Sequence, residues 1–420
     1  MAVTGACALA AILLVALAAI AVRRFATHPR NPPAHRPPVT VLKPLCGDEP
    51  MLEAALATIC GQDYPELQIV FGVQDAADPA LIAVRAVRQR FPGCDITVVV
   101  DHDVHGPNRK ISNLMNMLPA ARHDLLVLSD SDLHVPSDYI EQIVAALDRP
   151  GIGLVTTLCT GLPTRPGLVA RLGATAITHS FLPGALMSRT LGRQDCLGTT
   201  MALRRDILAQ IGGLDALVEH VADDNVLGQR VRQAGLGIGL AAVVPMTGVP
   251  EHSLGALFEH EVRWARTIRA LEPALFVTST LQFPLFWTAA LVLLTGGAAW
   301  AAGLFGAAWL VRVAAALAVD RALQPRPRRA AVPALLLPMR DLLSVGIVAA
   351  GYLGGRVVWR GRVLHVDAPR RALSKAQPKR TDATPALTAH GVRGGSLQSA
   401  GTGAVNAVQT CVRPSSGMPT

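Results

Sequence analysis

The stretch Leu125-Leu-Val-Leu-Ser-Asp-Ser-Asp132 decides how the rest of the chain is interpreted. Its first half is a continuous apolar run, which is typical of a strand buried in a parallel sheet. Two acids, Asp130 and Asp132, follow directly. Ligands of open α/β sheets bind outside the carboxyl ends of the strands, so these carboxylates can share a hard cation such as Mg²⁺ or Mn²⁺. A turn or helix N-cap, where Asp and Ser are also favoured, is the alternative.

Strands and helices alternate on both sides of this stretch. Short apolar runs predict strands, and segments with helical spacing of apolar residues predict the helices between them. The predicted strands are residues 38–44, 67–75, 95–101, 125–128 and 152–156, and the predicted helices are residues 49–62, 79–91, 108–117 and 136–147. This alternation favours an α/β domain over residues 39–250, with a mostly parallel sheet and helices on both faces.

Polar side chains stand where three of these strands end. Lys43 and Asp75 end the first and second strands, and the Asp130/Asp132 pair ends the fourth. That is the layout of a nucleotide site across strand ends. The sequence has no Gly-x-x-x-x-Gly-Lys loop, and no Gly-x-Gly-x-x-Gly follows a strand, which disfavours ATP or dinucleotide sites of those kinds.

Two later segments add further candidates. The segment from Cys196 to Leu208 contains Gly198 and Thr199, and a glycine allows the backbone to approach a ligand closely. Residues 221–227 carry Asp223 and Asp224 at the predicted mouth of a helix. In one arrangement Asp223 caps that helix and Asp224 points into the cleft. Capping without any chemical role is the alternative.

Apolar segments flank the α/β region. Residues 5–22 are apolar without interruption, close to the length that a spanning helix needs, so residues 1–24 are predicted as a transmembrane helix. Its arginines follow the apolar stretch, whereas a signal peptide carries its charge before it. The positive-inside rule then places the following residues in the cytoplasm. Residues 25–38 are predicted to be a proline-rich linker.

The C-terminal part is predicted to return to the membrane. Residues 251–275 read as an amphipathic helix on the membrane surface, although a solvated, salt-bridged helix also fits. Residues 276–365 contain the spanning candidates 283–302, 303–319 and 331–353, which give two or three helices. Charged residues interrupt them and are expected to be paired or at the interface, because ionisable groups are costly at membrane depth: Arg312, Arg340 and Asp341. Residues 366–420 have the composition of a disordered tail.

Composition excludes some functions. The formal net charge is +9, but five of these charges belong to residues 366–420, and only 4% of the residues are aromatic. Neither a basic surface nor a base-stacking surface is therefore indicated, and we expect no nucleic-acid partner. The seven cysteines are scattered without metal-ligand spacing, which suggests reduced thiols.

Six short motifs follow one another along the chain: Lys43-Pro-Leu, Gln74-Asp75 with Asp78-Pro79, Lys110-Ile-Ser-Asn-Leu-Met115, Asp130-Ser-Asp132, Asp223-Asp224 and His260-x-x-Arg263-Trp264. Taken together and in order, these motifs resemble the ceramide glucosyltransferase family of membrane glycosyltransferases with the GT-A fold. Within that family the bacterial hopanoid-biosynthesis glycosyltransferase is the most similar in character. The resemblance covers roughly residues 39–270 and, more loosely, the flanking helices.

The resemblance implies a role for each motif. Asp130 and Asp132 would hold Mg²⁺ or Mn²⁺ on the diphosphate of a UDP-sugar, and Asp224 would deprotonate the acceptor hydroxyl, with inversion at the anomeric carbon. Arg263 and Trp264 would close over the diphosphate and the acceptor entrance. The remaining donor-side residues would be Lys43, Asp75, Lys110 and Asn113, and the acceptor-side residues would be Gly198, Thr199, Asp223 and His260.

The chain departs from the family pattern at two positions. The last motif usually begins with Gln or Arg, and here it begins with His260, which leaves the role of that position open. The animal enzymes lack a second acid where this chain has Asp132. That acid fits the bacterial branch and an ordinary metal site.

The predicted protein is thus a multi-pass enzyme of the bacterial inner (plasma) membrane with a cytoplasmic catalytic domain. It would move N-acetylglucosamine from its UDP-sugar to a bacteriohopanetetrol-like lipid. One alternative is a ceramide glucosyltransferase that uses UDP-glucose, and a second is a processive polysaccharide synthase. An alternative of another class is a membrane scaffold whose transferase domain has decayed.

Overall fold

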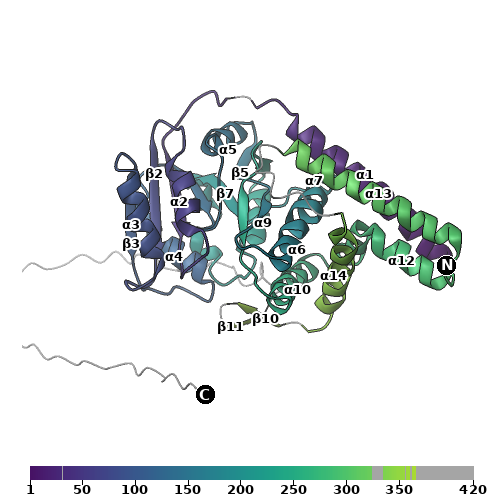
Figure 1. Ribbon diagram of the computed structural model, residues 1–420. Coiled ribbons are helices and arrows are strands. Elements are labelled where there is room, and N and C mark those ends of the chain that lie inside the picture. Colours follow the sequence, from purple (N-terminus) through teal and green to yellow (C-terminus); the bar gives the residue numbers. More distant parts are fainter. Residues whose placement is uncertain (31, 324–333, 355, 360–361, 366–420) are drawn as a thin grey trace, which may run out of the picture. The chain divides into compact units, whose positions relative to one another are not determined.

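A computed structural model of the chain describes residues 1–30, 32–323, 334–354, 356–359 and 362–365. The tail that the sequence predicts over residues 366–420 lies outside these ranges. The central element is a seven-stranded sheet in the order β3-β2-β1-β4-β7-β5-β8 (Figure 1). Its strands are β1 (Val39–Pro44), β2 (Leu67–Val73), β3 (Asp95–Val100), β4 (Leu125–Ser129), β5 (Ile152–Thr156), β7 (Thr200–Arg204) and β8 (Gly237–Leu240).

Helices cover both faces of this sheet. Successive strand residues point to opposite faces, and both sets are apolar, so both faces are buried under helices. Val41 and Val127 belong to the core beneath one group of helices, and their neighbours Leu42 and Leu128 belong to the core on the opposite face. The first group comprises α2 (Leu52–Cys60), α3 (Ala80–Arg90) and α5 (Tyr139–Leu147), and the second comprises α4 (Arg109–Met117), α8 (Arg205–Gln210) and α9 (Asp223–Gln233). The predicted α/β class, with a mostly parallel sheet covered on both faces, is confirmed.

Strand β7 is the exception to the parallel arrangement. It runs antiparallel to both of its neighbours, β4 and β5. An antiparallel strand begins at the edge where its parallel neighbours end. The loop before β7 therefore starts beside the carboxyl end of β4, and a backbone hydrogen bond of 3.1 Å from the Asp130 N–H to the Thr199 carbonyl fixes this contact.

A helical segment that the sequence analysis did not predict follows β6 (Thr160–Pro163). It consists of α6 (Leu168–Ala176), a π-helical turn (Ile177–Phe181) and α7 (Leu182–Thr190). Pro183 has no N–H to donate to the carbonyl of His179, four residues earlier. That carbonyl instead accepts a 2.8 Å hydrogen bond from Arg312. The irregular turn thus attaches this segment to the C-terminal helices.

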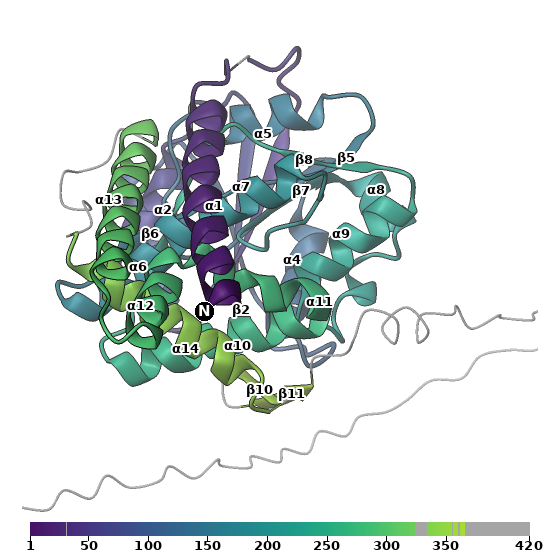
Figure 2. The same ribbon diagram turned by 90° about the vertical axis from the view of Figure 1, so that its right-hand side faces the viewer.

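The apolar helices at the two ends of the described chain pack together. Helices α1 (Ala2–Ala26), α12 (Pro284–Leu294) and α13 (Ala299–Ala322) lie side by side (Figures 1 and 2). By length and composition α1 and α13 can cross a membrane. A third span is possible if the pair 273–282 and 284–294, bent by 75°, counts as one. The first predicted membrane segment therefore coincides with a helix long enough to span.

The predicted bounds of the next helices were wrong. A turn at residues 295–298 separates α12 from α13, where the sequence analysis placed one helix over 283–302 and a second over 303–319. Gly296 and Gly297 both adopt positive φ, which glycine reaches without steric cost and which ends the helix. Helix α14 (Leu336–Gly351) has 16 residues, fewer than the roughly 20 that a span needs.

The segment before these helices carries the last sequence motif. Helix α10 (Leu254–Leu271) begins at Ser253, whose hydroxyl caps it by accepting a 3.2 Å hydrogen bond from the Ala256 N–H. A helix is thus present within residues 251–275, where the sequence predicts one. The short helix α11 (Pro273–Phe276) and a 3₁₀ turn (Val277–Gln282) follow. A two-stranded parallel sheet of β6 and β9 (Met246–Val249) connects the main sheet to α10.

Candidate active site

Lys110 is the centre of a charged cluster at the carboxyl edge of the sheet. It lies in the first turn of α4, which Asn108 caps by accepting from the Ile111 N–H at 3.1 Å. Its ammonium is 2.6 Å from Asp130 Oδ1, 4.0 Å from Asp223 Oδ2, and donates to the Gly198 carbonyl at 3.0 Å. Burial opposes the charged form, but the two carboxylates raise the pKa of Lys110 above its usual value. The cation therefore joins β4, α9 and the loop before β7.

Asp223 and Asp224 begin α9 and differ in their partners. Asp223 Oδ1 accepts a 3.1 Å hydrogen bond from Asn108. No side chain caps α9, whose N-cap residue is Ala222, so the suggested capping role of Asp223 is not what the structure contains. Burial, with the charge of Asp223 second, raises the pKa of Asp224 to about 7. A carboxyl with that pKa exchanges protons near neutral pH.

Gly198 lies directly against Asp224. A β-carbon at position 198 would be 3.0 Å from Asp224 Oδ2, closer than such contacts normally are. The absence of a side chain therefore allows the backbone of this loop to reach the carboxylate. Thr199 follows, and its carbonyl accepts from the Asp130 N–H. The structure thus brings together four of the sequence-predicted positions, Lys110, Asp130, Gly198 and Asp224.

Asp130 and Asp132 leave one oxygen each for a cation. Asp132 Oδ2 accepts from Thr247 Oγ1 at 2.6 Å and from the Gly248 N–H at 2.9 Å, both on β9. Asp130 Oδ1 faces Lys110. Within the described ranges, the hydrogen bonds and ion pairs of the two carboxylates use no other oxygen. Burial, and then the charge of Asp130, raises the pKa of Asp132. Two adjacent carboxylates with free hard oxygens fit Mg²⁺ or Mn²⁺.

Lys43 supports this turn from inside the protein. Its side chain is fully buried, and its ammonium donates to the Asp130 carbonyl at 2.5 Å and to Ser129 Oγ at 3.2 Å. Burial lowers the pKa of Lys43 to about 8. Its contacts hold the Asp130 turn against the end of β1. Lys43 therefore acts from the protein interior and not from the surface of the site.

Asp75 and Asn113 make their hydrogen bonds elsewhere. Asp75 is exposed after β2, and its carboxylate accepts from the Ala77 N–H at 2.8 Å. Asn113 is buried in α4 and donates to the Gly72 carbonyl at 2.8 Å, which ties that helix to the end of β2. Among the residues described, no hydrogen bond or ion pair joins either side chain to the Lys110 cluster.

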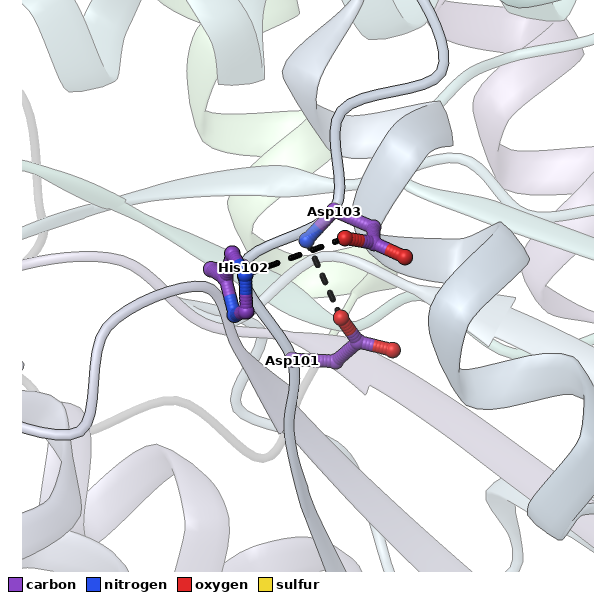
Figure 3. Close-up of side chains that lie close together, drawn as sticks. All are labelled: Asp101, His102 and Asp103. Carbon is purple, nitrogen blue, oxygen red and sulfur yellow. Dashed lines mark hydrogen bonds and ion pairs between the residues drawn. The ribbon is translucent and has the colours of Figure 1, made fainter. Parts of the chain in front are cut away.

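A second group of potential ligands, absent from the sequence analysis, follows β3. Asp101, His102 and Asp103 bring one candidate atom each within 4.8 Å of the others (Figure 3). The Asp103 N–H donates to Asp101 Oδ1 at 3.0 Å, which is an ordinary turn contact. The side chains of His102 and Asp103 are 93% and 66% exposed, so this group is a solvated loop rather than an enclosed site.

The last motif lies on α10. His260 hydrogen-bonds Glu251, and its ring meets Trp264 edge to face with centroids 4.5 Å apart. Burial would raise the pKa of Glu251, but the hydrogen bond and charge of His260 lower it. Arg263 is half-buried one turn along, and Trp264 is 43% exposed. The position that departs from the family pattern, His260, thus orients the adjoining strand-to-helix loop.

An apolar cavity of about 350 Å³ lies beside this motif. Trp264 of α10 and Leu197, the residue before Gly198, both line it. Further walls come from α7, the 276–283 segment and α14, and from residues 176–181 and 193–195. The sequence did not predict this cavity, because its walls come from segments up to about 190 residues apart and, of these, α10 alone carries a motif that the sequence analysis named.

An α/β fold with paired carboxylates and a buried lysine at the strand ends fits the class of nucleotide-dependent transferases. The sequence matches glycosyl transferase family 21 over residues 3–372, so the protein belongs to this family of sugar transferases. The predicted family is confirmed, and the hopanoid-associated branch stays a prediction.

Relatives of known activity are distant. Ceramide glucosyltransferase 1 of Caenorhabditis elegans is 22% identical over 256 residues, 61% of this chain and 55% of the nematode protein. Ceramide glucosyltransferase of Komagataella phaffii is 31% identical over 115 residues, 26% of this chain and 23% of the yeast protein. The chain therefore spans about half the length, or less, of these relatives. Among solved structures, a mannosyltransferase from Pyrobaculum calidifontis in complex with GDP-Man and Mn²⁺ has a TM-score of 0.49 at 20% identity, covering 84% of this chain and 98% of its own.

Proposed function

We propose that this protein transfers a sugar from a UDP-sugar to the hydroxyl of a membrane lipid, with inversion at the anomeric carbon. One observation carries the proposal. Lys110 joins Asp130 to the start of α9, where Asp224, whose pKa is about 7, lies against the backbone of Gly198. The proposed cation ligands and the proposed base thus lie at one sheet edge, an arrangement that suits an inverting sugar transfer.

The donor side of the site handles the diphosphate. Asp130 and Asp132 would hold a divalent cation through their free oxygens, and the bound cation would neutralise negative charge that develops on the leaving diphosphate. Lys110 supplies a fixed positive charge beside it, and Arg263 is proposed to supply a second. Lys43 is proposed to act by positioning, since it binds the Asp130 turn from the protein interior. Asp75 and Asn113 remain proposed nucleotide contacts.

Asp224 is proposed to act on the acceptor. Its Oδ1 accepts from the Asn225 N–H at 2.7 Å, which leaves Oδ2, the oxygen nearest to Gly198, to accept the hydroxyl proton. A base works best when its pKa lies near the working pH. As the oxygen–hydrogen bond of the acceptor breaks, the proton passes to Asp224, the hydroxyl oxygen bonds to the anomeric carbon, and UDP leaves from the opposite face.

The lipid is either of the two kinds that the sequence analysis raised. The ceramide glucosyltransferases among the relatives favour ceramide and UDP-glucose. The bacterial character of the sequence motifs favours a hopanoid polyol and UDP-N-acetylglucosamine. The two long apolar helices support attachment to a lipid bilayer, where either acceptor resides. Location in a bacterial inner membrane, with the catalytic domain in the cytoplasm, belongs to the same proposal.

The test uses membranes that contain the full chain. Radiolabelled UDP-glucose and UDP-N-acetylglucosamine are compared with Mn²⁺ or Mg²⁺, and ceramide and bacteriohopanetetrol are offered separately. We expect label in the lipid extract with one pairing, loss of the label in Asp224→Asn, and inverted anomeric configuration in the product.

The possible results distinguish the two acceptor lipids and test whether the protein is an enzyme. Transfer of glucose to ceramide would keep the mechanism and reject the hopanoid branch, and transfer of N-acetylglucosamine to the hopanoid would do the reverse. A chain that binds UDP with Mn²⁺ but labels no lipid would contradict the lipid acceptor. A chain that does not bind UDP at all would contradict the enzyme and favour the scaffold alternative.

A further inference from the structure

We infer that the apolar cavity beside Trp264 binds a single flexible alkyl chain of a neutral acceptor lipid. The inference rests on the proposed function, since it assigns the acceptor's place in that reaction. The cavity volume, about 350 Å³, is at the lower end of the range of roughly 300–1,000 Å³ that is usual for small-molecule sites. It suits one slender chain better than a fused ring system.

The cavity reaches from the catalytic loop toward the apolar helices. One lining residue is Leu197, whose neighbour Gly198 lies against Asp224. The lining also includes Phe276 and Phe283. Helix α1, a candidate span, contacts α7 and the 277–282 turn, two elements that line the cavity. A lipid with its chain among these helices and its hydroxyl near Leu197 would present that hydroxyl to the proposed base.

The lining is largely apolar. It includes Ala185 of α7, Ile268 of α10 and Ile347 of α14. Where α7 meets the 277–282 turn, a β-carbon at Gly184 would lie 2.4 Å from the side-chain oxygen of Gln282. That close approach restricts the width of the cavity. Apolar walls favour burial of methylene groups, whereas a polar head group gains nothing from them.

Among the described residues, four charged ones line the cavity: Arg189, Arg193, Asp195 and Glu261. Three of them form ion pairs within the protein. Arg340 binds Glu261 through both guanidinium nitrogens, at 2.9 and 2.7 Å. Arg193 pairs with Asp195 at 2.9 Å and with Glu272 at 2.8 Å. The fourth charged group, Arg189, donates to the carbonyl of Ile238. Because ion pairs already use three of these four charges, the cavity complements an uncharged lipid better than a lipid phosphate.

The test reads binding separately from catalysis. Full-length protein in detergent is mixed with a ceramide that carries a photoreactive diazirine in its acyl chain, without donor sugar. We expect labelled peptides from α7, α10 and α14, and we expect unlabelled ceramide to compete for them. Ala185→Phe fills the cavity and should weaken labelling and raise the acceptor KM by about tenfold or more, which is the scale of a shape change in an apolar pocket.

A matched control separates cavity filling from a general effect of phenylalanine. Ala209→Phe is the same exchange at an exposed position of α8, outside the cavity, and should leave labelling unchanged. If Ala185→Phe does not fold, Ile268→Asp replaces it. Ile268 is 47% exposed, and Leu254 on the same helix, 54% exposed and outside the cavity, provides the control Leu254→Asp.

The outcomes distinguish this inference from the proposed function. Equal labelling in Ala185→Phe and Ala209→Phe, or adducts on other elements, would overturn the inference even if sugar transfer is observed. Stronger competition by bacteriohopanetetrol than by ceramide would contradict the inference that the ligand is a flexible alkyl chain. Stronger competition by a polyprenyl phosphate would contradict the inference that the ligand is a neutral lipid. Specific labelling without any sugar transfer would keep the cavity as a lipid site and count against the proposed reaction.

Discussion

Two charged regions of the molecule are built in opposite ways. At the edge of the sheet, Asp130 and Asp132 each keep an oxygen without a protein partner among the described residues, and Asp224 has a pKa raised to about 7. Between the C-terminal helices, Arg340 is held by both oxygens of Glu261, and Arg312 contacts Asp341 at 3.3 Å. The first region has carboxylate oxygens left to bind a ligand, whereas in the second region the charged side chains bind one another.

The difference teaches where to look for chemistry. Buried charges are costly unless they are paired and hydrogen-bonded. A region that satisfies every charge internally gains a fixed geometry, and a region that leaves charges unsatisfied needs a ligand to complete it. We therefore expect substitutions at the sheet edge to change rates more than stability. Substitutions among the helices should do the reverse.

The largest expected effect is the loss of Asp224. Asp224→Asn removes the proposed base while keeping the size of the side chain, so kcat should fall by about 10²–10⁴-fold, the usual contribution of a general base. Initial rates with saturating UDP-sugar measure the effect, and binding of UDP should remain. A variant with more than a tenth of normal activity would show that another group takes the proton.

The next effect concerns the buried pair on the helical side. Arg340→Met leaves Glu261 buried without its partner, and breaking such a pair costs about 3–5 kcal/mol. Thermal unfolding in detergent should show a large fall in Tm, while UDP binding at permissive temperature persists.

The double variant Glu261→Gln/Arg340→Met provides the control for that prediction. Because it removes both charges, it should recover much of the Tm that Arg340→Met loses. An additive loss in the double variant would mean that the two side chains act independently and that their pairing contributes little.

The pH dependence of the rate is a smaller effect. With a pKa of about 7, Asp224 is protonated in acid, so kcat should fall about tenfold for each pH unit below 6 and level off above 8. A pH profile of single-turnover transfer measures this. A flat profile between pH 5 and 8 would exclude a base with this pKa.

The raised pKa of Asp224 also predicts how stability changes with pH. The pKa of Asp224 is raised from 3.8, so its contribution to stability is fully present below pH 3.8 and is lost as pH rises through about 7. Asn does not ionise, so Asp224→Asn removes the loss of stability that ionisation of Asp224 causes at high pH. Its Tm relative to the unsubstituted protein should therefore be higher at pH 8 than at pH 5, whereas a difference independent of pH would contradict the raised pKa.

The smallest effect concerns an exposed pair. Arg30 and Asp138 are 3.0 Å apart with side chains 50% and 30% exposed. Arg30→Ala should change stability by about 0–1 kcal/mol, because solvent screens exposed pairs. A Tm within the error of the unsubstituted protein is expected at high salt. A loss comparable to that of Arg340→Met would undo the contrast between exposed and buried pairs.

Sequence reasoning succeeded where the information is local. The apolar run 125–128 became β4, and the alternation of strands and helices gave the right class of fold. The sequence predicts that Arg312 and Arg340 are paired or at the interface, and the structure shows them paired. The cost of a buried charge predicts this without knowledge of the partner. Their partners, Asp341 and Glu261, came only from the structure.

Sequence reasoning failed where a local pattern is ambiguous. Arg312 is the one charged residue in the otherwise uncharged run from 283 to 319, so hydropathy could not locate the turn that Gly296 and Gly297 make. The segment 168–190 alternates small, polar and apolar residues, and tertiary contacts such as that of Arg312 with the His179 carbonyl accompany its π-helical turn. The antiparallel β7 carries no sign of its direction in its own residues.

The sequence by itself determined the α/β class, the family and the paired acids at a strand end, because each depends on residues close together in the chain. The tertiary structure alone decided that Lys110 joins Asp130 to Asp223, that Asp132 rests on β9, and that α7, α10 and α14 enclose an apolar cavity. These contacts join residues from about 20 to 190 positions apart. They exist only after the sheet has brought its strand ends together and the helices have packed, and a pattern within one segment cannot encode them.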